Sequence, residues 1–206
     1  MPRFDLFSIG HSNIAEQQFL ALLRGAGVTS IADVRSVPHS RFYPWFSQKQ
    51  LSASLAAADI GYAAMGDTPG GRPRDDGLYR DGVADYEAMA ARPEYAAGLG
   101  RLLDAVARSQ VCVLCAEREP LDCHRCLLVA RSVGERGLTV GHILHDGSIE
   151  PHAETEQRLL ALRGYGDDRD LFASGQHERL AAAYRRRGHA VAFRRKAATR
   201  ALAEPQ

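Results

Sequence analysis

The chain has 206 residues, a hydrophobic content of 45% and a formal net charge of +1. This length and composition indicate a globular domain with a sizeable core and exclude a chain that is disordered throughout. The net charge near zero gives no global reason to expect binding to nucleic acid or to a membrane. No apolar run of about 18 residues and no signal region is found, so a cytoplasmic protein without membrane contact is expected.

Hydrophobic periodicity predicts alternating strands and helices along most of the chain. The segment 66–82 contains five glycines and two prolines, which is typical of a mobile loop that closes over a ligand and equally of a disordered, solvated loop. The helical pattern at 85–107 is expected to break at Pro93, because proline suits the start of a helix. The predicted strands are 4–10, 28–34, 60–65, 111–115 and 139–144, and the predicted helices are 15–25, 47–59, 85–107, 127–133, 154–162 and 177–187.

This alternation predicts an α/β fold with a mainly parallel sheet sandwiched by helices, a Rossmann-like arrangement of three layers. We expect residues 1–150 to form the α/β domain. Residues 151–206 show little strand signal beyond 190–193 and are expected to form a helical, basic C-terminal extension.

The segment 115–125 is the densest cluster of reactive side chains in the sequence. It follows the buried strand 111–115, and Asp122 is predicted to cap the next helix. Cys123 would then lie in the first helical turn, where the helix dipole favours a thiolate. Pro120 keeps Glu117 in the preceding loop, which makes Glu117 a candidate general base or nucleophile. The alternative is a structural cluster of buried cysteines and paired charges.

Other polar side chains follow the remaining strands of the predicted sheet. Ligands of parallel sheets bind at the carboxyl ends of the strands, so these side chains are expected to meet there. The candidate catalytic residues are Glu117, Cys123, His11, His124 and Cys115. The candidate substrate-binding residues are Arg35, Ser36, Ser40, Arg41, Arg125 and Ser12.

All four cysteines lie between positions 112 and 126, with a spacing that invites comparison with zinc sites. Cys112 and Cys115 would point to opposite faces of one strand, and Cys126 would lie a turn beyond Cys123. A zinc ion held by all four is therefore not expected, and the sequence predicts neither a metal nor a cofactor. A site formed by Cys115, Cys123 and His124 or His11 stays open.

Several ordered motifs resemble the domain of unknown function 488 family. They are Gly10-His-Ser-Asn, the segment from Asp33 to Arg41, Gly70-Gly71, the pattern Cys-x-Glu-x-x-Pro-x-x-Cys-His-Arg ending at Arg125, and His142 followed by Asp146-Gly. The resemblance spans roughly residues 4–150. It implies an α/β fold and a polar signature formed by His11, Asp33, Arg35, Ser36, Ser40, Arg41, Cys115, Glu117, Cys123, His124, Arg125 and His142.

Three functions are compatible with these residues. The first is a hydrolase or transferase that acts on a small anionic substrate, such as a nucleotide or sugar phosphate, because guanidinium groups and a helix N-terminus bind phosphate. The second is a nucleic-acid-binding or processing protein. The third is a sensor that binds an anion without turnover. The second function would use the basic residues Arg185, Arg186, Arg187, Arg194, Arg195 and Lys196.

Overall fold

Six strands form a single sheet in the order β3-β2-β6-β1-β7-β8 in the computed structural model, which describes residues 3–68, 70–162 and 175–195. Every neighbouring pair is parallel except β7 and β8. The mainly parallel sheet predicted from the sequence is therefore confirmed. The strands are β1 (Leu6–Gly10), β2 (Ser30–Asp33), β3 (Gly61–Ala64), β6 (Val111–Cys115), β7 (Val140–Ile143) and β8 (Ile149–Pro151).

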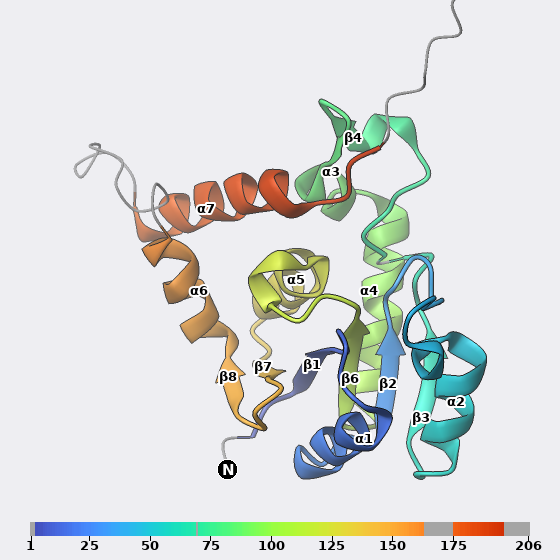
Figure 1. Cartoon of the computed structure of the whole chain (residues 1–206). Helices are drawn as coiled ribbons and strands as arrows, with labels where there is room; N and C mark the ends of the chain where they lie inside the picture. Colours follow the sequence, from blue (N-terminus) through green and yellow to red (C-terminus); the bar gives the residue numbers. More distant parts are fainter. Residues whose placement is uncertain (1–2, 69, 163–174, 196–206) are drawn as a thin grey trace, which may run out of the picture.

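Helices cover both faces of this sheet (Figure 1). Alternate residues of each strand enter different cores, as the period of two requires. Phe7 and Ile9 of β1 pack with α1 (Glu16–Gly25) and α2 (Gln48–Ala56). Leu6 of the same strand packs on the opposite side, with α4 (Pro93–Val106), the π-helix η4 (Arg125–Ala130) and α5 (Arg131–Gly134). The three-layer α/β fold follows from this division.

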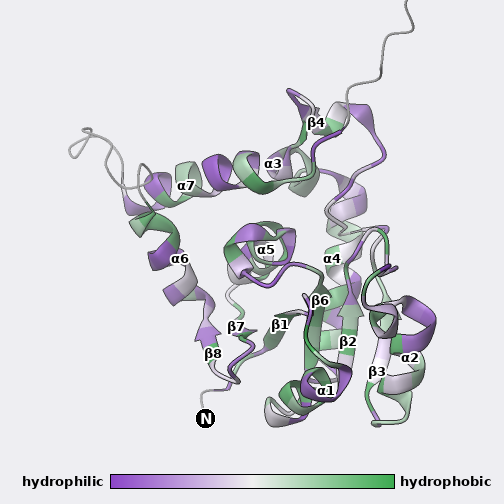
Figure 2. Cartoon of the chain, viewed as in Figure 1, coloured by the Kyte–Doolittle hydropathy of each residue, from purple (hydrophilic) through white to green (hydrophobic). Residues whose placement is uncertain are grey.

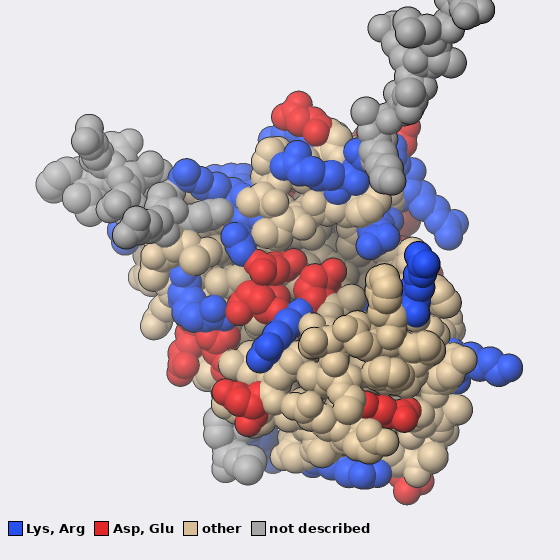
Figure 3. Space-filling model, in the orientation of Figure 1, with Lys and Arg blue, Asp and Glu red and all other residues tan. Residues whose placement is uncertain are grey.

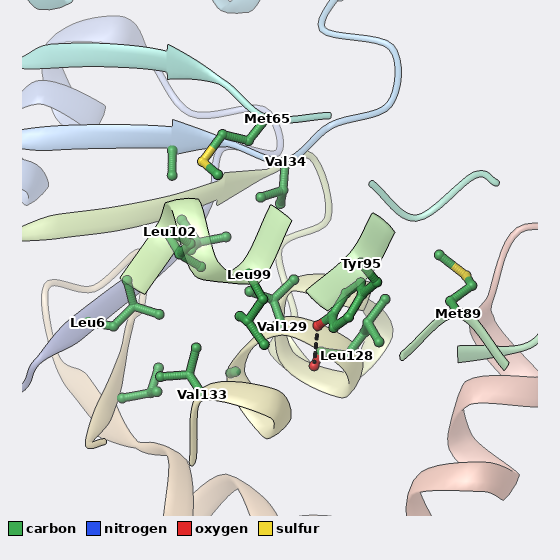
Figure 4. Close-up of a cluster of buried hydrophobic side chains, with 14 of the residues drawn as sticks. Leu6, Val34, Met65, Met89, Tyr95, Leu99, Leu102, Leu128, Val129 and Val133 are labelled. Atoms are coloured by element: carbon green, nitrogen blue, oxygen red, sulfur yellow. Dashed lines mark hydrogen bonds between the residues drawn. The ribbon is translucent and has the colours of Figure 1, made fainter. Parts of the chain in front are cut away.

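The two cores account for most of the buried apolar side chains. Figure 4 shows the core on the α4 side, where Leu99 and Leu102 meet Val129 and Val133. The strands of the sheet centre are coloured as hydrophobic in Figure 2. A continuous apolar run, rather than strict alternation with polar residues, is expected for strands that are buried on both faces.

The predicted break in the helical region 85–107 is confirmed. Asp85 caps α3 (Tyr86–Ala90) by accepting hydrogen bonds from the Glu87 and Ala88 N–H groups. Pro93 begins α4, because its missing N–H costs nothing at a helix start. The preceding glycine-rich segment is partly ordered, since it forms the short helix η2 (Asp76–Leu78) and the hairpin β4 (Tyr79–Arg80) and β5 (Val83–Ala84).

The described part of the C-terminal extension is helical. It consists of α6 (His152–Ala161) and α7 (Gln176–Val191), which pack on η4 and on the short helix η3 (Pro120–Asp122) through a third apolar cluster containing Tyr184. The strand signal at 190–193 is wrong, because α7 continues to Val191. Only a single bridge between Arg194 and Val83 follows.

At the centre of the sheet, the connections that follow two neighbouring strands run over opposite faces of the sheet. β1 and β6 are neighbours, but β1 leads into α1 on one face and β6 leads into η4 on the other. The loops that leave these two strands therefore diverge, and they leave a crevice at the carboxyl ends. This is the position at which open α/β sheets bind ligands.

Candidate functional site

A cavity of about 320 Å³ lies at this crevice. Its volume is within the range of small-molecule sites. It brings together eight of the eleven residues that the sequence assigned to a site. These are His11, Arg35, Ser36, Ser40, Cys115, Glu117, Cys123 and His124.

Two thiols and one carboxylate form the floor of the cavity. Cys115 is the last residue of β6, and Cys123 precedes the helix that follows. The Sγ atoms of Cys115 and Cys123 lie 2.9 Å and 3.0 Å from the same Oε2 atom of Glu117. Both thiols are buried, whereas Glu117 is exposed toward the cavity. Glu117 is therefore the group of this cluster that solvent and a bound molecule reach.

His124 completes the cluster from the other side. Its Nε2 atom lies 3.1 Å from the Val34 carbonyl oxygen, so this nitrogen carries the proton and donates it. The Nδ1 atom then faces the Sγ atoms of Cys115 and Cys123, at 3.5 Å and 3.8 Å. Burial opposes a charge on this ring, but the hydrogen bond with Cys123 outweighs burial and raises the His124 pKa above its usual value. Gly71 leaves room for the ring, because a Cβ atom on Gly71 would lie 2.7 Å from the imidazole Cγ and Nδ1 atoms.

The start of this helix differs from the prediction by one residue. Asp122 does not cap the helix, because Glu119 and Pro120 place it at the end of η3. Cys123 takes the capping position: it is extended, its carbonyl accepts from Cys126 and Leu127, and its Sγ atom lies 3.4 Å from the Arg125 N–H. The thiol thus lies at the end of the helix that favours anions.

The two thiols are not equivalent. Burial raises the pKa of the Cys115 thiol, and the neighbouring Cys123 raises it further. Burial also opposes ionisation of Cys123, but the hydrogen bond from Cys115 and the guanidinium of Arg125 hold the Cys123 pKa below its usual value. Of the pair, Cys123 is the thiol that ionises first.

Arg125, which the sequence assigned to substrate binding, lies behind the cavity and is not among its lining residues. Its side chain is fully buried, and its Nη1 and Nη2 atoms donate to the carbonyl oxygens of Glu117 and Arg118, at 2.6 Å and 2.9 Å. These two hydrogen bonds hold the loop before Cys123 in place. Arg125 is thus a positioning residue for Glu117.

A second wall of the cavity is built around Arg35. Asp33 binds both ends of its guanidinium, with distances of 2.8 Å to Nε and 2.6 Å to Nη2. The Nη1 atom donates to the Phe46 carbonyl and lies 3.2 Å from His11 Nε2. Because Asp33 neutralises it, Arg35 is a weaker anion ligand than the sequence suggested.

His11 has both ring nitrogens engaged. Nδ1 donates to the Ser12 carbonyl at 2.9 Å, and Nε2 accepts from Arg35. Burial and the adjacent Arg35 charge lower the His11 pKa to about 4. The ring also stacks on Phe46, with centroids 4.2 Å apart. His11 is neutral at pH 7, lines the cavity and hydrogen-bonds the Arg35 guanidinium.

The rim of the cavity comes from segments far apart in the sequence. Arg72, in the glycine-rich segment, is anchored by its N–H to Ser36 Oγ at 3.0 Å. Its guanidinium lies over the Phe193 ring, 4.7 Å from the centroid. Sequence reasoning missed Tyr86, Val191 and Phe193 as lining residues. The composition of 66–82 marked Arg72, but no local signal links Phe193 to residues more than a hundred positions earlier.

Comparison with known families gives one match. A family model described as "Domain of unknown function DUF488" matches residues 16–132, more than half of the chain. The chain belongs to the DUF488 family. Searches of curated proteins and of solved structures found no match.

The DUF488 match contains the floor of the cavity but not its whole rim. Cys115, Glu117, Cys123 and His124 lie inside it, whereas His11 and Phe193 lie outside. The polar residues that the resemblance implied do not form one spatial cluster. His142 lies in the core and contacts Ser8 and His152.

Two further predicted substrate-binding residues, Ser12 and Arg41, lie away from the cavity lining. Ser12 has a positive φ of 45° and forms the turn after β1. Arg41 is exposed and lies near the Phe42 ring. Neither is placed to contact a molecule on the cavity floor, so the structure does not unite them with the other predicted substrate-binding residues.

The remaining two cysteines of this DUF488 chain are far from forming one metal site with the others. Cys112 points into the core formed with α1 and α2, on the opposite face of β6 from Cys115. Cys126 lies beside His152, at 4.0 Å from Nδ1. The strand geometry expected from the sequence thus separates the four sulfur atoms.

The predicted basic cluster is largely engaged within the protein. Arg187 binds Asp122 and the Leu121 carbonyl, Arg185 pairs with Glu87, and Arg195 pairs with Asp76. Lys196 lies outside the described residues. On the face shown in Figure 3, basic and acidic side chains are interspersed. Among the described residues, no helix combines the length and apolar character needed to cross a membrane.

Proposed function

We propose that this DUF488 protein is an enzyme, a hydrolase or transferase, that acts on a small anionic substrate in the cavity at the carboxyl edge of the sheet. One observation carries the proposal. Glu117 reaches the open cavity while its carboxylate contacts two buried thiols. A cluster of reactive groups at the floor of an open cavity is typical of an active site.

The Arg72 side chain is the feature that favours an anionic substrate. In the part of the chain that the structure describes, no carboxylate lies within ion-pair distance of its guanidinium, whereas Arg35 and Asp33 neutralise each other. Phe193 holds the Arg72 side chain at the rim, and Ser36 holds its backbone. An unpaired guanidinium matches the geometry of phosphate and carboxylate oxygens.

Glu117 is the residue that carries the chemistry in this proposal. Its carboxylate forms part of the cavity floor, where it accepts a proton from a water molecule or a substrate hydroxyl group. The loop that bears it is fixed by Arg125 through the Glu117 carbonyl. A carboxylate held in this way is aligned before the substrate enters.

The proposal is tested with wild-type protein and Glu117→Gln against nucleotides, sugar phosphates and simple phosphate and carboxylate esters. Ligand-observed NMR measures binding, and mass spectrometry measures turnover. We expect Glu117→Gln to bind as wild type does and to lose turnover, because the amide accepts no proton. Glu135→Gln, an exposed substitution of the same type outside the cavity, serves as the control.

The same panel separates the alternatives. Binding without turnover by wild type would replace the enzyme with an anion sensor. Arg72→Ala is expected to weaken binding about tenfold, since a charged hydrogen bond contributes roughly 1.5 kcal/mol, and Arg41→Ala to leave it unchanged. If no anion binds, or if both arginine variants behave alike, the proposal is wrong.

A further inference from the structure

We infer that Cys115, Cys123 and His124 bind a thiophilic divalent cation, above all Zn²⁺, with Glu117 as the fourth ligand on the cavity side. The inference rests on the proposed function and deepens it. Glu117 would bind the cation through Oε2, the oxygen that contacts both Sγ atoms, and Oε1 would remain for the proton transfer proposed above. The inference draws on the arrangement of four ligand atoms, on the orientation of the His124 ring and on a contrast with a second cluster.

The four ligand atoms already have the spacing of a metal site. One atom from each residue lies within 4.8 Å of all the others. In a tetrahedral zinc site, Zn–S bonds of about 2.3 Å and Zn–N bonds of about 2.0 Å place sulfur and nitrogen roughly 3.6 Å apart. The distances from His124 Nδ1 to the two Sγ atoms are 3.5 Å and 3.8 Å.

The sulfur-to-carboxylate distances are shorter, at 2.9 Å and 3.0 Å. Both sulfur atoms thus lie against the same Oε2 atom of Glu117, closer than two ligands of one zinc ion would be. A cation at the centre would satisfy all four groups at once and move the carboxylate outward by about half an ångström.

The surroundings of the ligands also fit a metal. A metal-binding imidazole commonly donates its other N–H to a carbonyl, as His124 does to Val34. Gly71 leaves the space that this ring orientation needs. The backbone N–H of Arg125 points at the Cys123 sulfur, as expected for a hydrogen bond to a thiolate.

A second group with similar residue types shows what a structural cluster looks like here. Cys126, His142 and His152 also lie within 4.8 Å of one another. In that group, however, the ring nitrogens are used by Ser8, by Tyr184 and by the other histidine. No bare nitrogen is left for a metal, so the inference applies to the cavity floor alone.

The experiment loads the full chain with Zn²⁺ or Co²⁺ at neutral pH, removes loose metal by gel filtration and measures metal content by mass spectrometry. We expect one metal per chain. The Co²⁺ form should show thiolate-to-metal charge transfer and the visible bands of tetrahedral cobalt. Cys115→Ser and Cys123→Ser should lose the metal, whereas the matched variant Cys126→Ser should retain it.

Wild-type protein that is folded and holds no stoichiometric metal would overturn the inference, and so would equal metal loss in Cys126→Ser. If a cysteine variant fails to fold, the cobalt spectrum of the wild type decides: a thiolate band supports the site, and its absence refutes it. Metal binding and turnover are separate readouts. Turnover without metal leaves the enzyme proposal standing, and metal without turnover leaves only the site.

Discussion

Gly10 shows how tightly single residues hold the candidate site. It ends β1, where the loop bearing Glu117 crosses it. A Cβ atom added at Gly10 would lie 1.7 Å from the Glu117 carbonyl oxygen and 2.8 Å from Arg125 Nη1. Glycine is required here by close approach and not by a special φ angle. The absence of a side chain at Gly10 also leaves room for Arg125 Nη1, which donates to the Glu117 carbonyl.

Gly10→Ala is therefore expected to lower the free energy of unfolding by about 3 kcal/mol, since the backbone of the Glu117 loop must move. Urea denaturation measures the change. Gly100→Ala is the control, because nothing lies within 4 Å of a Cβ atom at that position in α4, and a gain of about 1 kcal/mol is expected there. Equal effects of the two substitutions would contradict the role of the close contact.

At the scale of elements, a chain of buried polar groups joins two strands to two helices. Ser8 of β1 donates to His142 of β7, His142 donates to His152 of α6, and His152 donates to Tyr184 of α7. Tyr184 donates its hydroxyl proton to Glu156, so it must accept a hydrogen bond from His152. The donor in each earlier hydrogen bond of this series follows in turn. Both histidines are consequently neutral and carry their proton on Nε2.

The neutrality of His152 has a consequence for acid stability. Burial lowers its pKa to about 4, whereas an unfolded histidine titrates near 6.5. The unfolded state therefore binds more protons between these values, and stability falls as the pH drops from about 6.5 to 4. Burial and the neighbouring His152 hold the His142 pKa well below its usual value, which adds to this loss.

Urea denaturation at several pH values should show this loss, which amounts to about 3 kcal/mol for His152. His152→Gln is expected to reduce the slope of stability against pH, whatever its effect on stability at pH 7.5. His177→Gln, at an exposed histidine of α7, should leave the slope unchanged. An unchanged slope in His152→Gln would show that His152 is not the source.

On the scale of the whole molecule, the segment after α7 closes one side of the cavity. The Phe193 carbonyl accepts from the Ala84 N–H, and Arg195 donates its N–H to the Gly82 carbonyl. Ala192 is buried in the core. The segment is thus tied to the β4–β5 hairpin. The described part of the C-terminal extension consequently contributes to the site as well as to the core.

Removing this cover should expose the thiols. In protein treated with a chelator, Phe193→Ala is expected to raise alkylation of Cys115 and Cys123 by iodoacetamide several-fold, as followed by peptide mass spectrometry. Cys112 and Cys126 should stay unreactive, since they lie in the cores. Phe42→Ala removes a more exposed phenylalanine outside the cavity lining and should change nothing. Equal alkylation rates in the two variants would count against the covering role of Phe193.

Sequence reasoning predicted the sheet, because its strands are long apolar runs separated by clear turn signals. It also predicted the strand ends that meet at the cavity, since the topology of parallel sheets brings them together. It assigned Arg125 to the substrate, because a sequence does not reveal that its partners are main-chain carbonyls. It placed the helix start at Asp122, since the usual capping preferences do not include cysteine.

The ion pair between Arg187 and Asp122 ties the cavity floor to a part of the chain outside the family match. The family model matches residues 16–132, yet the loop before Cys123 is held by a helix outside that region, and Phe193 lines the cavity from beyond it as well. The reactive floor and the entrance are thus encoded in different parts of the gene. A relative with the same floor residues and a different C-terminal segment would have a different entrance above an unchanged floor.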